Sequence, residues 1–356
     1  MDIESYFDDF EDRDWQRGAE GTLRLAMVGL GWWTTDRAMP AVAETEHCET
    51  TVVVSGTKEK AEGVAEEEEL AAGITYEEFQ NGEASDAYDA VYICTPNATH
   101  LENALAAAEM GKDVLCEKPM EGDVERAEEM VEAFEGVDVQ LMVAYRMHTE
   151  PSVRRMKELV EEGFIGEPLA VHGHMSQSLL EMIPNPDQWR LNPELAGRGT
   201  SVTDLGIYPI NTTRFVLDTD PVSVTAQMVS EAEGFEDVPD ERATMTIDYD
   251  GVTASISASQ NMYSTGHLKI IGSEGELTLE PCFGNRTART LELRRNNIET
   301  TTVTPQPNQM LEEFAYFADR VLNDDPVHPD GEHGLHDMRT LEAVYDAAET
   351  GERQDI

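Results

Sequence analysis

The lysine at position 118 is the side chain with the clearest chemical potential in this sequence. Only six lysines occur among 356 residues, and Lys118 lies in the stretch Cys116–Met120, at the end of an apolar, strand-like run. A lysine ammonium is a compact point charge whose pKa shifts readily on burial, so it can polarise a substrate hydroxyl beside a cofactor. A surface lysine before a turn proline is the alternative interpretation, and this pattern alone favours neither.

A glycine-rich turn follows the first apolar run. Gly29 and Gly31 begin a GxGxxG-like stretch in which Trp32 and Trp33 come next and Thr34 replaces the third glycine. Glycines let the backbone approach a pyrophosphate, and the N-terminus of the following helix attracts its charge. An ordinary strand-to-helix turn also uses glycine, but the position of this one between a strand and a helix favours a dinucleotide. We expect all five residues to contact the cofactor.

The end of the second expected strand indicates which dinucleotide binds. NAD sites place a carboxylate there, on the ribose 2′-hydroxyl. Here Ser55 and Lys58 occupy the position, and no acid occurs before Glu59. A hydroxyl and a lysine suit a 2′-phosphate, so the sequence predicts NADP. The alternative for Lys58 is a solvated residue at a helix N-terminus, although a cation there opposes the helix dipole.

These residues require a fold that brings strand ends and helix starts together. From Thr22 to about Tyr145, short apolar runs alternate with helical segments, which is typical of a parallel, doubly wound α/β sheet of the Rossmann type. The expected strands are 23–28, 50–54, 90–94, 113–116 and 139–144. The expected helices are 35–45, 58–72, 100–110 and 123–134.

The second half of the chain has a different pattern. After a helix over 151–162, strand-like stretches follow one another, and turn signals such as Asp250-Gly251 separate them. This predicts an α+β domain with an open, mostly antiparallel sheet. Its expected strands are 169–176, 222–229, 244–248, 252–258, 267–271 and 276–279, and its last helices are 308–322 and 336–350.

Three regions are therefore expected along the chain. Residues 1–20 form an acidic N-terminal extension and residues 21–146 the Rossmann dinucleotide-binding domain. Residues 147–356 form the α+β substrate and oligomerisation domain, whose C-terminal helix can pack back on the first domain.

The charge balance is extreme, with 72 acidic and 25 basic residues and a net charge of −47. No basic patch is available for the phosphates of a nucleic acid or for an anionic membrane, so we expect neither as a partner. Such self-repulsion is screened at molar salt, where the Debye length is about 3 Å. The acid excess extends through segments with apolar periodicity, which favours a halophilic protein over a disordered acidic tail.

Cysteine usage and the N-terminus indicate the compartment. Cys48, Cys94, Cys116 and Cys282 are widely spaced and form no CxxC pair or His/Cys cluster, so neither disulfides nor a metal site are expected. The first 20 residues lack the charged and apolar regions of a signal peptide, and no apolar run approaches the length of a membrane span. We expect a cytoplasmic protein.

Five stretches taken in order resemble the Gfo/Idh/MocA oxidoreductase family, in particular its glucose-fructose oxidoreductase and pentose dehydrogenase type. The resemblance covers nearly everything from Leu23 to Arg353. The stretches are Gly29-Leu30-Gly31, Thr95-Pro96-Asn97-Ala98-Thr99-His100, Cys116-Glu117-Lys118-Pro119, 144–151 with Arg146 and His148, and 196–208 with Asp204 and Tyr208.

The resemblance implies roles for these residues. Lys118 would lie by the nicotinamide and the substrate hydroxyl, with Asp204 and Tyr208 at spacing i, i+4 on one helix face. Many relatives have histidine where Tyr208 stands, and the tyrosine is similar to the branch that acts on the anomeric carbon of sugars. A core aromatic is the alternative for Tyr208. Further residues implied on the cofactor side are Thr95, Pro96, Asn97, His100, Glu117 and Lys118 itself.

The substrate pocket is less well defined. Arg146 and His148 are candidates for it, although a structural role is equally open for both and for His100. Arg198 interrupts the usual run of small residues, so its role is undetermined. The resemblance also implies that the Lys118-Pro119 peptide bond is cis, and that the open sheet forms the interface of a homodimer or homotetramer.

The expected activity is NADP-dependent oxidation of a cyclic aldose at the anomeric carbon to the lactone, with D-xylose favoured by the resemblance alone. Tyr208 would accept the proton, Lys118 would assist it, and Asp204 would orient the sugar. A glucose dehydrogenase, or a glucose-fructose oxidoreductase-like enzyme that retains its cofactor, would use the same residues. From another class, a non-catalytic NADP-binding regulator is the alternative, against which the intact catalytic residues argue.

Overall fold

The computed structural model describes residues 10, 13–15, 19–284, 288–304 and 307–356. The expected extension over 1–20 therefore lies largely outside the described residues. The chain divides into two compact units, and each is interleaved in sequence. One unit combines Trp15–Arg146 with Asn308–Met338, and the other combines Met147–Pro307 with Arg339–Ile356 and the segment Met1–Asp14. We call the unit with Trp15–Arg146 the nucleotide unit and the unit with Met147–Pro307 the sheet unit. The domain limits expected from the sequence stay a prediction.

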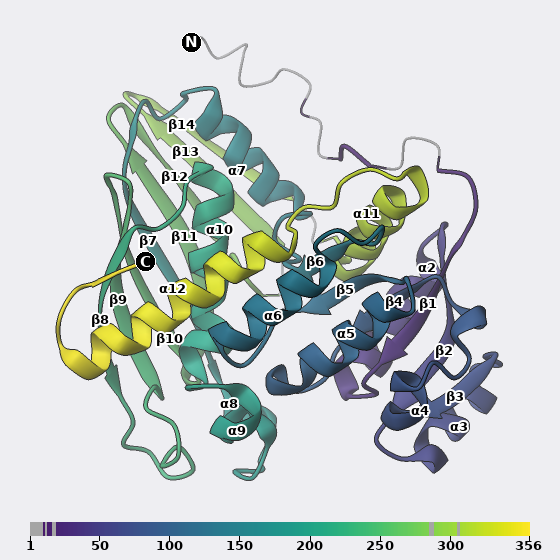
Figure 1. Ribbon diagram of the computed structural model, residues 1–356. Helices are drawn as coiled ribbons and strands as arrows, with labels where there is room; N and C mark the ends of the chain where they lie inside the picture. Colours follow the sequence, from purple (N-terminus) through teal and green to yellow (C-terminus); the bar gives the residue numbers. More distant parts are fainter. Residues whose placement is uncertain (1–9, 11–12, 16–18, 285–287, 305–306) are drawn as a thin grey trace. The chain divides into compact units, whose positions relative to one another are not determined.

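The nucleotide unit is built on a six-stranded sheet with the order β3-β2-β1-β4-β5-β6 (Figure 1). All its described strand pairs are parallel. The order reverses between β1 and β4, and such a reversal leaves a crevice at the carboxyl ends of the two strands. The predicted doubly wound α/β fold is confirmed. The strands are β1 (Leu23–Val28), β2 (Cys48–Ser55), β3 (Ala72–Thr75), β4 (Ala90–Ile93), β5 (Asp113–Glu117) and β6 (Leu141–Ala144).

Helices follow the strands closely in this unit. The side chain of Asp123 accepts a hydrogen bond from the Arg126 N–H and so caps its helix, while Thr75 and Glu78 form a reciprocal capping box. Phe314 and Phe317 of the late helix α11 are fully buried in the same core as β1. The helical segments are η1 (Thr34–Ala38), α2 (Met39–Glu44), α3 (Lys58–Glu67), α4 (Tyr76–Gln80), η2 (Ser85–Ala87), η3 (Asn97–Thr99), α5 (His100–Glu109), α6 (Val124–Phe134) and α11 (Gln309–Asn323).

One expected helix is shorter than predicted. The acidic helix expected over 58–72 ends at Glu67, and the chain then forms β3 and the short helix α4. Gly73 lies so close to α3 that a Cβ there would be 2.2 Å from the Ala61 carbonyl oxygen. The strand packs tightly on the helix through a residue without a side chain. Apolar periodicity carries no sign of such a contact, which explains the error.

The sheet unit contains a nine-stranded sheet with the order β14-β13-β12-β11-β7-β10-β9-β8-β15. Its described pairs are antiparallel except β7 with β10, so the predicted open, mostly antiparallel sheet is confirmed. The strands are β7 (Pro168–Ser178), β8 (Ser223–Val229), β9 (Arg242–Tyr249), β10 (Val252–Ser259), β11 (Asn261–Gly272), β12 (Gly275–Glu280), β13 (Arg289–Arg295), β14 (Ile298–Thr304) and β15 (Gln354–Asp355).

The inner face of this sheet is apolar and covered by helices. Val171, Ile247 and Leu268 are fully buried on it. At Gly173 a Cβ would lie 2.8 Å from the Pro209 side chain, so α10 packs directly on β7. Figure 1 shows α7 and α10 side by side along the long strands. The helical segments of the unit are α7 (Pro151–Glu161), α8 (Leu179–Met182), η4 (Trp189–Leu191), α9 (Pro193–Ala196), η5 (Val202–Gly206), α10 (Ile207–Leu217) and most of α12 (Gly331–Thr350).

Strands β13 and β14 were not expected from the sequence. Leu291 and Leu293 are buried on β13, but Glu292 separates them, and threonine and arginine flank the pair, so the apolar alternation is only two residues long. β14 is a mostly exposed edge strand rich in threonine. An edge strand needs little apolar surface, so its sequence pattern is weak. No helix in the described part of the chain has the length and apolarity needed to cross a membrane.

Candidate active site

The glycine-rich turn lies at the carboxyl end of β1, beside the start of the loop that follows β4. Gly29 has a φ of +100°, and a Cβ on it would lie 2.2 Å from the Cys94 carbonyl oxygen, so only glycine fits. A Cβ on Gly31 would meet nothing within 4 Å. Trp32 is 44% exposed, whereas Thr34 is fully buried in the first turn of η1. The backbone here is open to a bound diphosphate, as NADP requires.

Trp32 and Trp33 also contact each other, with ring centroids 5.4 Å apart in an edge-to-face arrangement. The Trp33 ring is packed against the core of the unit, while Trp32 remains largely accessible. The pair therefore gives the turn one anchored ring and one ring available for contact. Their assignment to the cofactor stays a prediction.

Ser55 and Lys58 lie at the end of β2 and the start of α3, as the sequence indicated. Lys58 Nζ is 2.8 Å from Glu78 Oε2 in the structure. This hydrogen bond raises the pKa of the Lys58 ammonium and lowers the pKa of the Glu78 carboxyl. A 2′-phosphate would have to share the lysine with that carboxylate. The partner was not foreseen, because Glu78 follows 20 residues later on a helix that was itself missed.

Lys60 is a second lysine of α3, and no sequence pattern assigned it a role. Its ammonium donates a hydrogen bond of 2.6 Å to the Leu30 carbonyl oxygen, inside the glycine-rich turn. The contact fixes the backbone between Gly29 and Gly31 from the neighbouring helix. A lysine two residues after Lys58 carries no motif that would have revealed this role.

The loop after β4 carries Thr95, Pro96 and Asn97, and His100 ties it to the loop after β5. The His100 ring is fully buried, with Nε2 3.0 Å from the Thr95 carbonyl oxygen and Nδ1 3.3 Å from the Met120 carbonyl oxygen. These contacts describe a residue that holds two loops together. They favour the structural interpretation of His100 over direct contact with the cofactor.

Lys118 follows β5 directly and is half-buried. The Lys118-Pro119 peptide bond is cis, as the resemblance implied. The Lys118 N–H donates to Glu117 Oε2 at 3.3 Å, and the other oxygen of Glu117 accepts from the Tyr92 hydroxyl at 2.7 Å. Glu117 therefore has a visible function as an anchor for the backbone of Lys118.

A buried polar cluster surrounds Glu117 in the same unit. Arg146, predicted for the substrate pocket, donates to Gln309 of α11, and both side chains are buried. Burial raises the pKa of the Glu313 carboxyl well above its usual range; the charge of Glu117 adds to this and Arg146 partly offsets it. Arg146 thus belongs to the polar core beside β5 and β6 of this unit. Only tertiary structure reveals Gln309 and Glu313 as its neighbours.

The sheet unit holds Asp204 and Tyr208 on one continuous helical segment. Asp204 lies in the π-helical turn η5 and Tyr208 in the first turn of α10. The segment is thus wider at its start than the single α-helix expected from the sequence. Tyr208 is buried apart from 8% of its surface, and its ring centroid is 6.1 Å from that of Phe283.

The Asp204 carboxylate has two partners from distant segments. Its Oδ2 atom accepts hydrogen bonds from Arg190 Nε at 3.1 Å and from Gln260 Nε2 at 2.9 Å. Arg190 also stacks on the Trp189 ring, 4.5 Å from its centroid. Both partners were missed, because an arginine of the short helix η4 and a glutamine between β10 and β11 carry no recognisable motif.

His148 lies in the sheet unit, whereas Arg146 belongs to the nucleotide unit. The His148 ring is buried, with Nε2 2.8 Å from Asn211 Oδ1, and it stacks on Phe215 at a centroid distance of 4.1 Å. Both neighbours are on α10, so His148 fixes that helix to the segment before α7. This favours a structural role for His148.

Two family models match the chain. Residues 23–145 match the model described as oxidoreductase family, NAD-binding Rossmann fold, and residues 153–278 match the GFO/IDH/MocA C-terminal domain. The chain belongs to the Gfo/Idh/MocA oxidoreductase family. The resemblance stated from its motifs is thereby confirmed, and with it the assignment to the oxidoreductases.

Named relatives and a solved structure extend this result. The chain is 51% identical to "D-xylose 1-dehydrogenase [NADP(+)]" of Haloarcula marismortui, over 98% of both chains. It is 30% identical to "D-xylose 1-dehydrogenase (NADP(+)) 2" of Haloferax volcanii, over 92% of this chain and 97% of the other. The aldose-aldose oxidoreductase of Caulobacter crescentus, solved with glycerol, superposes with a TM-score of 0.87 at 28% identity and covers 94% of this chain and 100% of its own.

Proposed function

We propose that this chain is an NADP-dependent aldose 1-dehydrogenase that oxidises D-xylose at its anomeric carbon to the lactone. The observation that carries the proposal is the 51% identity, over 98% of both chains, to a relative named for this reaction. The glycine turn fits a diphosphate, and β2 ends on Ser55 without an acid. Both features suit NADP, the cofactor in the names of two relatives. We place the enzyme in the cytoplasm.

Three side chains have separate tasks in the proposed reaction. Tyr208 accepts the proton of the anomeric hydroxyl, and the Lys118 ammonium stabilises the resulting negative charge. Asp204, held by Arg190 and Gln260, orients the sugar through its hydroxyls. When bound, NADP+ supplies the hydride acceptor. Support for these roles comes from the family motif and from the way each unit fixes its own residues.

The decisive experiment is a substrate panel in molar KCl. Purified protein with NADP+ should reduce the cofactor on addition of D-xylose, and we expect a higher kcat/KM for xylose than for arabinose or glucose. NAD+ should be a poorer cofactor, because β2 ends on Ser55 and not on the carboxylate that NAD sites place on the ribose 2′-hydroxyl. If no aldose is oxidised with either cofactor, the proposal fails and a non-catalytic regulator becomes the better interpretation.

A second activity is favoured by the similarity to the aldose-aldose oxidoreductase. In that case one aldose is oxidised to a lactone and a second aldose is reduced to an alditol by the same cofactor molecule. With only trace NADP+, this reaction would yield lactone and alditol in equal amounts. Chromatography of the products distinguishes it from a dehydrogenase, which would stop once the cofactor is reduced.

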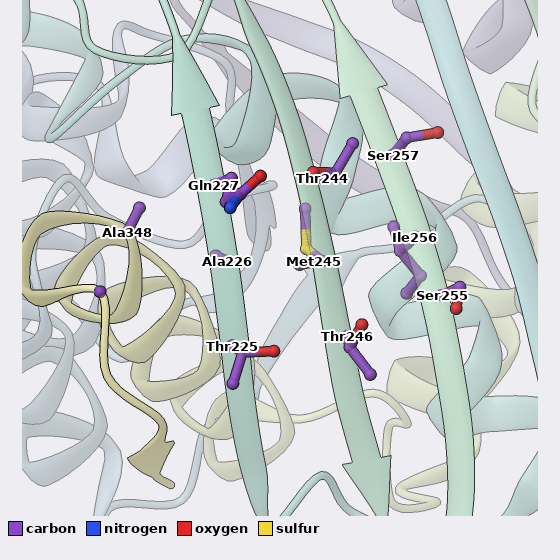
Figure 2. Close-up of a pocket in the computed structure, with 11 residues that line it drawn as sticks. Thr225, Ala226, Gln227, Thr244, Met245, Thr246, Ser255, Ile256, Ser257 and Ala348 are labelled. Carbon is purple, nitrogen blue, oxygen red and sulfur yellow. The ribbon is translucent and has the colours of Figure 1, made fainter.

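We also propose that the outer face of the nine-stranded sheet joins two copies of the chain. Figure 2 shows side chains of β8, β9 and β10 that line a hollow on this sheet. The volume of the hollow is about 690 Å³. In a chain of net charge −47, no residue lining it is charged. Two rows of paired residues cross the strands from β8 to β11, and neither contains a carboxylate. The first row is Gln227, Thr244, Ser257, His174 and His267. The second row is Thr225, Thr246, Ser255, His172 and Lys269.

An acidic protein can bring two copies together only over a surface that carries few carboxylates, because like charges repel. Thr246 is exposed on β9, the middle one of the three strands that line the hollow. Thr246→Asp places a carboxylate on this face in both copies and should lower the mass measured by light scattering in molar salt. Asn81→Asp, at the end of α4, adds the same charge elsewhere and should leave the mass unchanged. A monomeric wild-type protein would contradict the proposal.

A further inference from the structure

Asp240 is a buried carboxylate that the proposed mechanism does not use. It is fully buried and lies just before β9. Its Oδ1 atom accepts a hydrogen bond of 2.8 Å from the Thr200 N–H. Its Oδ2 atom accepts from the Val202 N–H and from the Tyr345 hydroxyl, each at 2.8 Å. Every one of these donors is at least 38 residues away in sequence.

The two N–H donors, Thr200 and Val202, lie at the start of η5, where a helical segment has N–H groups without partners inside the helix. Such groups are usually capped by the side chain of the residue just before the helix. Here Ser201 makes no such cap, and its hydroxyl donates instead to the Glu241 carbonyl oxygen at 2.9 Å. Asp240 therefore provides from a distant segment the acceptor that the local sequence does not provide.

The chain leaves room for this carboxylate. A Cβ on Gly199 would lie 2.3 Å from Asp240 Oδ1 and 2.6 Å from the Tyr345 hydroxyl oxygen. Arg198 extends over the Tyr345 ring, 5.5 Å from its centroid, and forms ion pairs with Asp346 and with Glu349, the latter at 3.2 Å. Arg198, which interrupts the run of small residues usual in the family, is thus bound to α12.

We propose that Asp240, together with Tyr345, is a positioning residue that fixes the start of the helical segment bearing Asp204 and Tyr208. The inference rests on the proposed function, because it assigns the segment a catalytic task. Val202 precedes Asp204 by two positions and Tyr208 by six, so the clamp lies within two turns of both side chains. A small displacement of a reacting group costs a large factor in rate, which makes such a clamp valuable.

The electrostatics support the same interpretation. Burial raises the pKa of Asp240 to about 6, and its hydrogen bonds only partly oppose the shift. At pH 8 the carboxylate is therefore ionised at a cost to stability. The pKa of the Tyr345 hydroxyl is raised, first by burial and then by Asp240, so it remains a donor. The ionised Asp240 carboxylate lowers the stability of the fold, yet it holds the start of η5. Such a group is expected where the exact position of a functional segment matters more than stability.

The test compares Asp240→Asn and Tyr345→Phe with Asp248→Asn. The control lies at the end of β9, where its carboxylate accepts from the Gly251 N–H in a turn. We expect kcat to fall about a hundredfold in Asp240→Asn and about tenfold in Tyr345→Phe, with KM for NADP+ unchanged. Hydrogen exchange at the Thr200 and Val202 amides should accelerate in both variants, and the control should match the wild type.

A purely structural role predicts a different result. In that case activity would fall only in proportion to folded protein, and kcat per folded molecule would stay within twofold of the wild type. That result overturns the proposal. If Asp240→Asn fails to fold, Tyr345→Phe, which keeps the ring, decides alone. All ratios are taken on whichever substrate the wild type turns over best, so a failure of the xylose assignment is distinguishable from a failure of the clamp.

Discussion

The two units fix their functional side chains in different ways. In the nucleotide unit the candidate residues follow the carboxyl ends of β1, β2, β4 and β5, and the parallel sheet gathers them. In the sheet unit Asp204 and Tyr208 come from one helical segment, which Arg190, Gln260 and Asp240 hold from distant segments. A site at strand ends depends on backbone topology, whereas a site on a helix depends on a few long-range polar contacts. Substitutions should therefore affect the two units differently.

The largest effect is expected at the proposed proton acceptor. Tyr208→Phe keeps the ring that contacts Phe283 and removes only the hydroxyl, so kcat should fall by about 10²–10⁴ while NADP binding barely changes. Tyr263→Phe, at a ring that is 88% exposed, is the matched control. Steady-state kinetics with direct titration of NADP measures both quantities.

The partner lysine sharpens this prediction. Lys118→Ala should do similar damage, and the double variant with Tyr208→Phe should lose much less than the product of the two factors. A wild-type kcat in Tyr208→Phe, with chemistry shown to limit turnover, would remove the tyrosine from the mechanism. His148, already bonded to Asn211, would then need to be tested as the base.

Substitutions at the residues proposed to bind the 2′-phosphate should change NADP affinity rather than kcat. Ser55→Asp places a carboxylate where a 2′-phosphate is proposed, so NADP affinity should fall roughly ten- to a hundredfold, equivalent to about 1.5–3 kcal/mol. Lys58→Met tests whether Lys58 serves only as the ion-pair partner of Glu78. If it does, the variant should change in stability but should keep the wild-type ratio of NADP to NAD affinity. A wild type that prefers NAD would refute the assignment of Ser55 and Lys58.

Salt should act on both units alike. With 72 acidic and 25 basic residues, repulsion among exposed carboxylates is strong in dilute buffer and screened in molar KCl. We expect the melting temperature to rise by several degrees across that range and activity to rise with it. An unchanged melting temperature would contradict a halophilic protein.

The smallest effect is a slope in stability with pH that belongs to the sheet unit. The pKa of Asp240 is raised from 3.8 to about 6, so the folded state binds its proton more tightly than the unfolded state. Its contribution to the free energy of unfolding therefore falls as pH rises from about 4 to about 6. The free energy of unfolding of wild type and of Asp240→Asn is measured by urea unfolding. Relative to the wild type, the variant should become more stable as pH rises from about 4 to about 6, and the difference in free energy should then stay constant. An equal difference at pH 4 and pH 7 would exclude the shift.

The sequence was most informative where residues close together in the chain work together. The alternation of strands and helices, the turn at Gly29 and the position of Lys118 could all be predicted, since each is a local pattern at a strand end. Strands β3 and β14 could not, because one packs through Gly73 and the other is a polar edge. Arg190 and Gln260 could not be predicted either, because their contacts with Asp204 bridge 14 and 56 residues.

The interleaving of the two units has a consequence during synthesis. The nucleotide unit begins at Trp15 but also requires Asn308–Met338, with Phe314 and Phe317 of α11 buried against the core that includes β1. A ribosome releases the chain from its N-terminus, and most domains fold as they emerge. Here the apolar surface that α11 covers stays exposed until more than 300 residues have been made. The segment Asn308–Met338, made after Met147–Pro307 of the sheet unit, thus completes the first unit to begin folding, and a fragment ending at Arg146 would lack part of its own core.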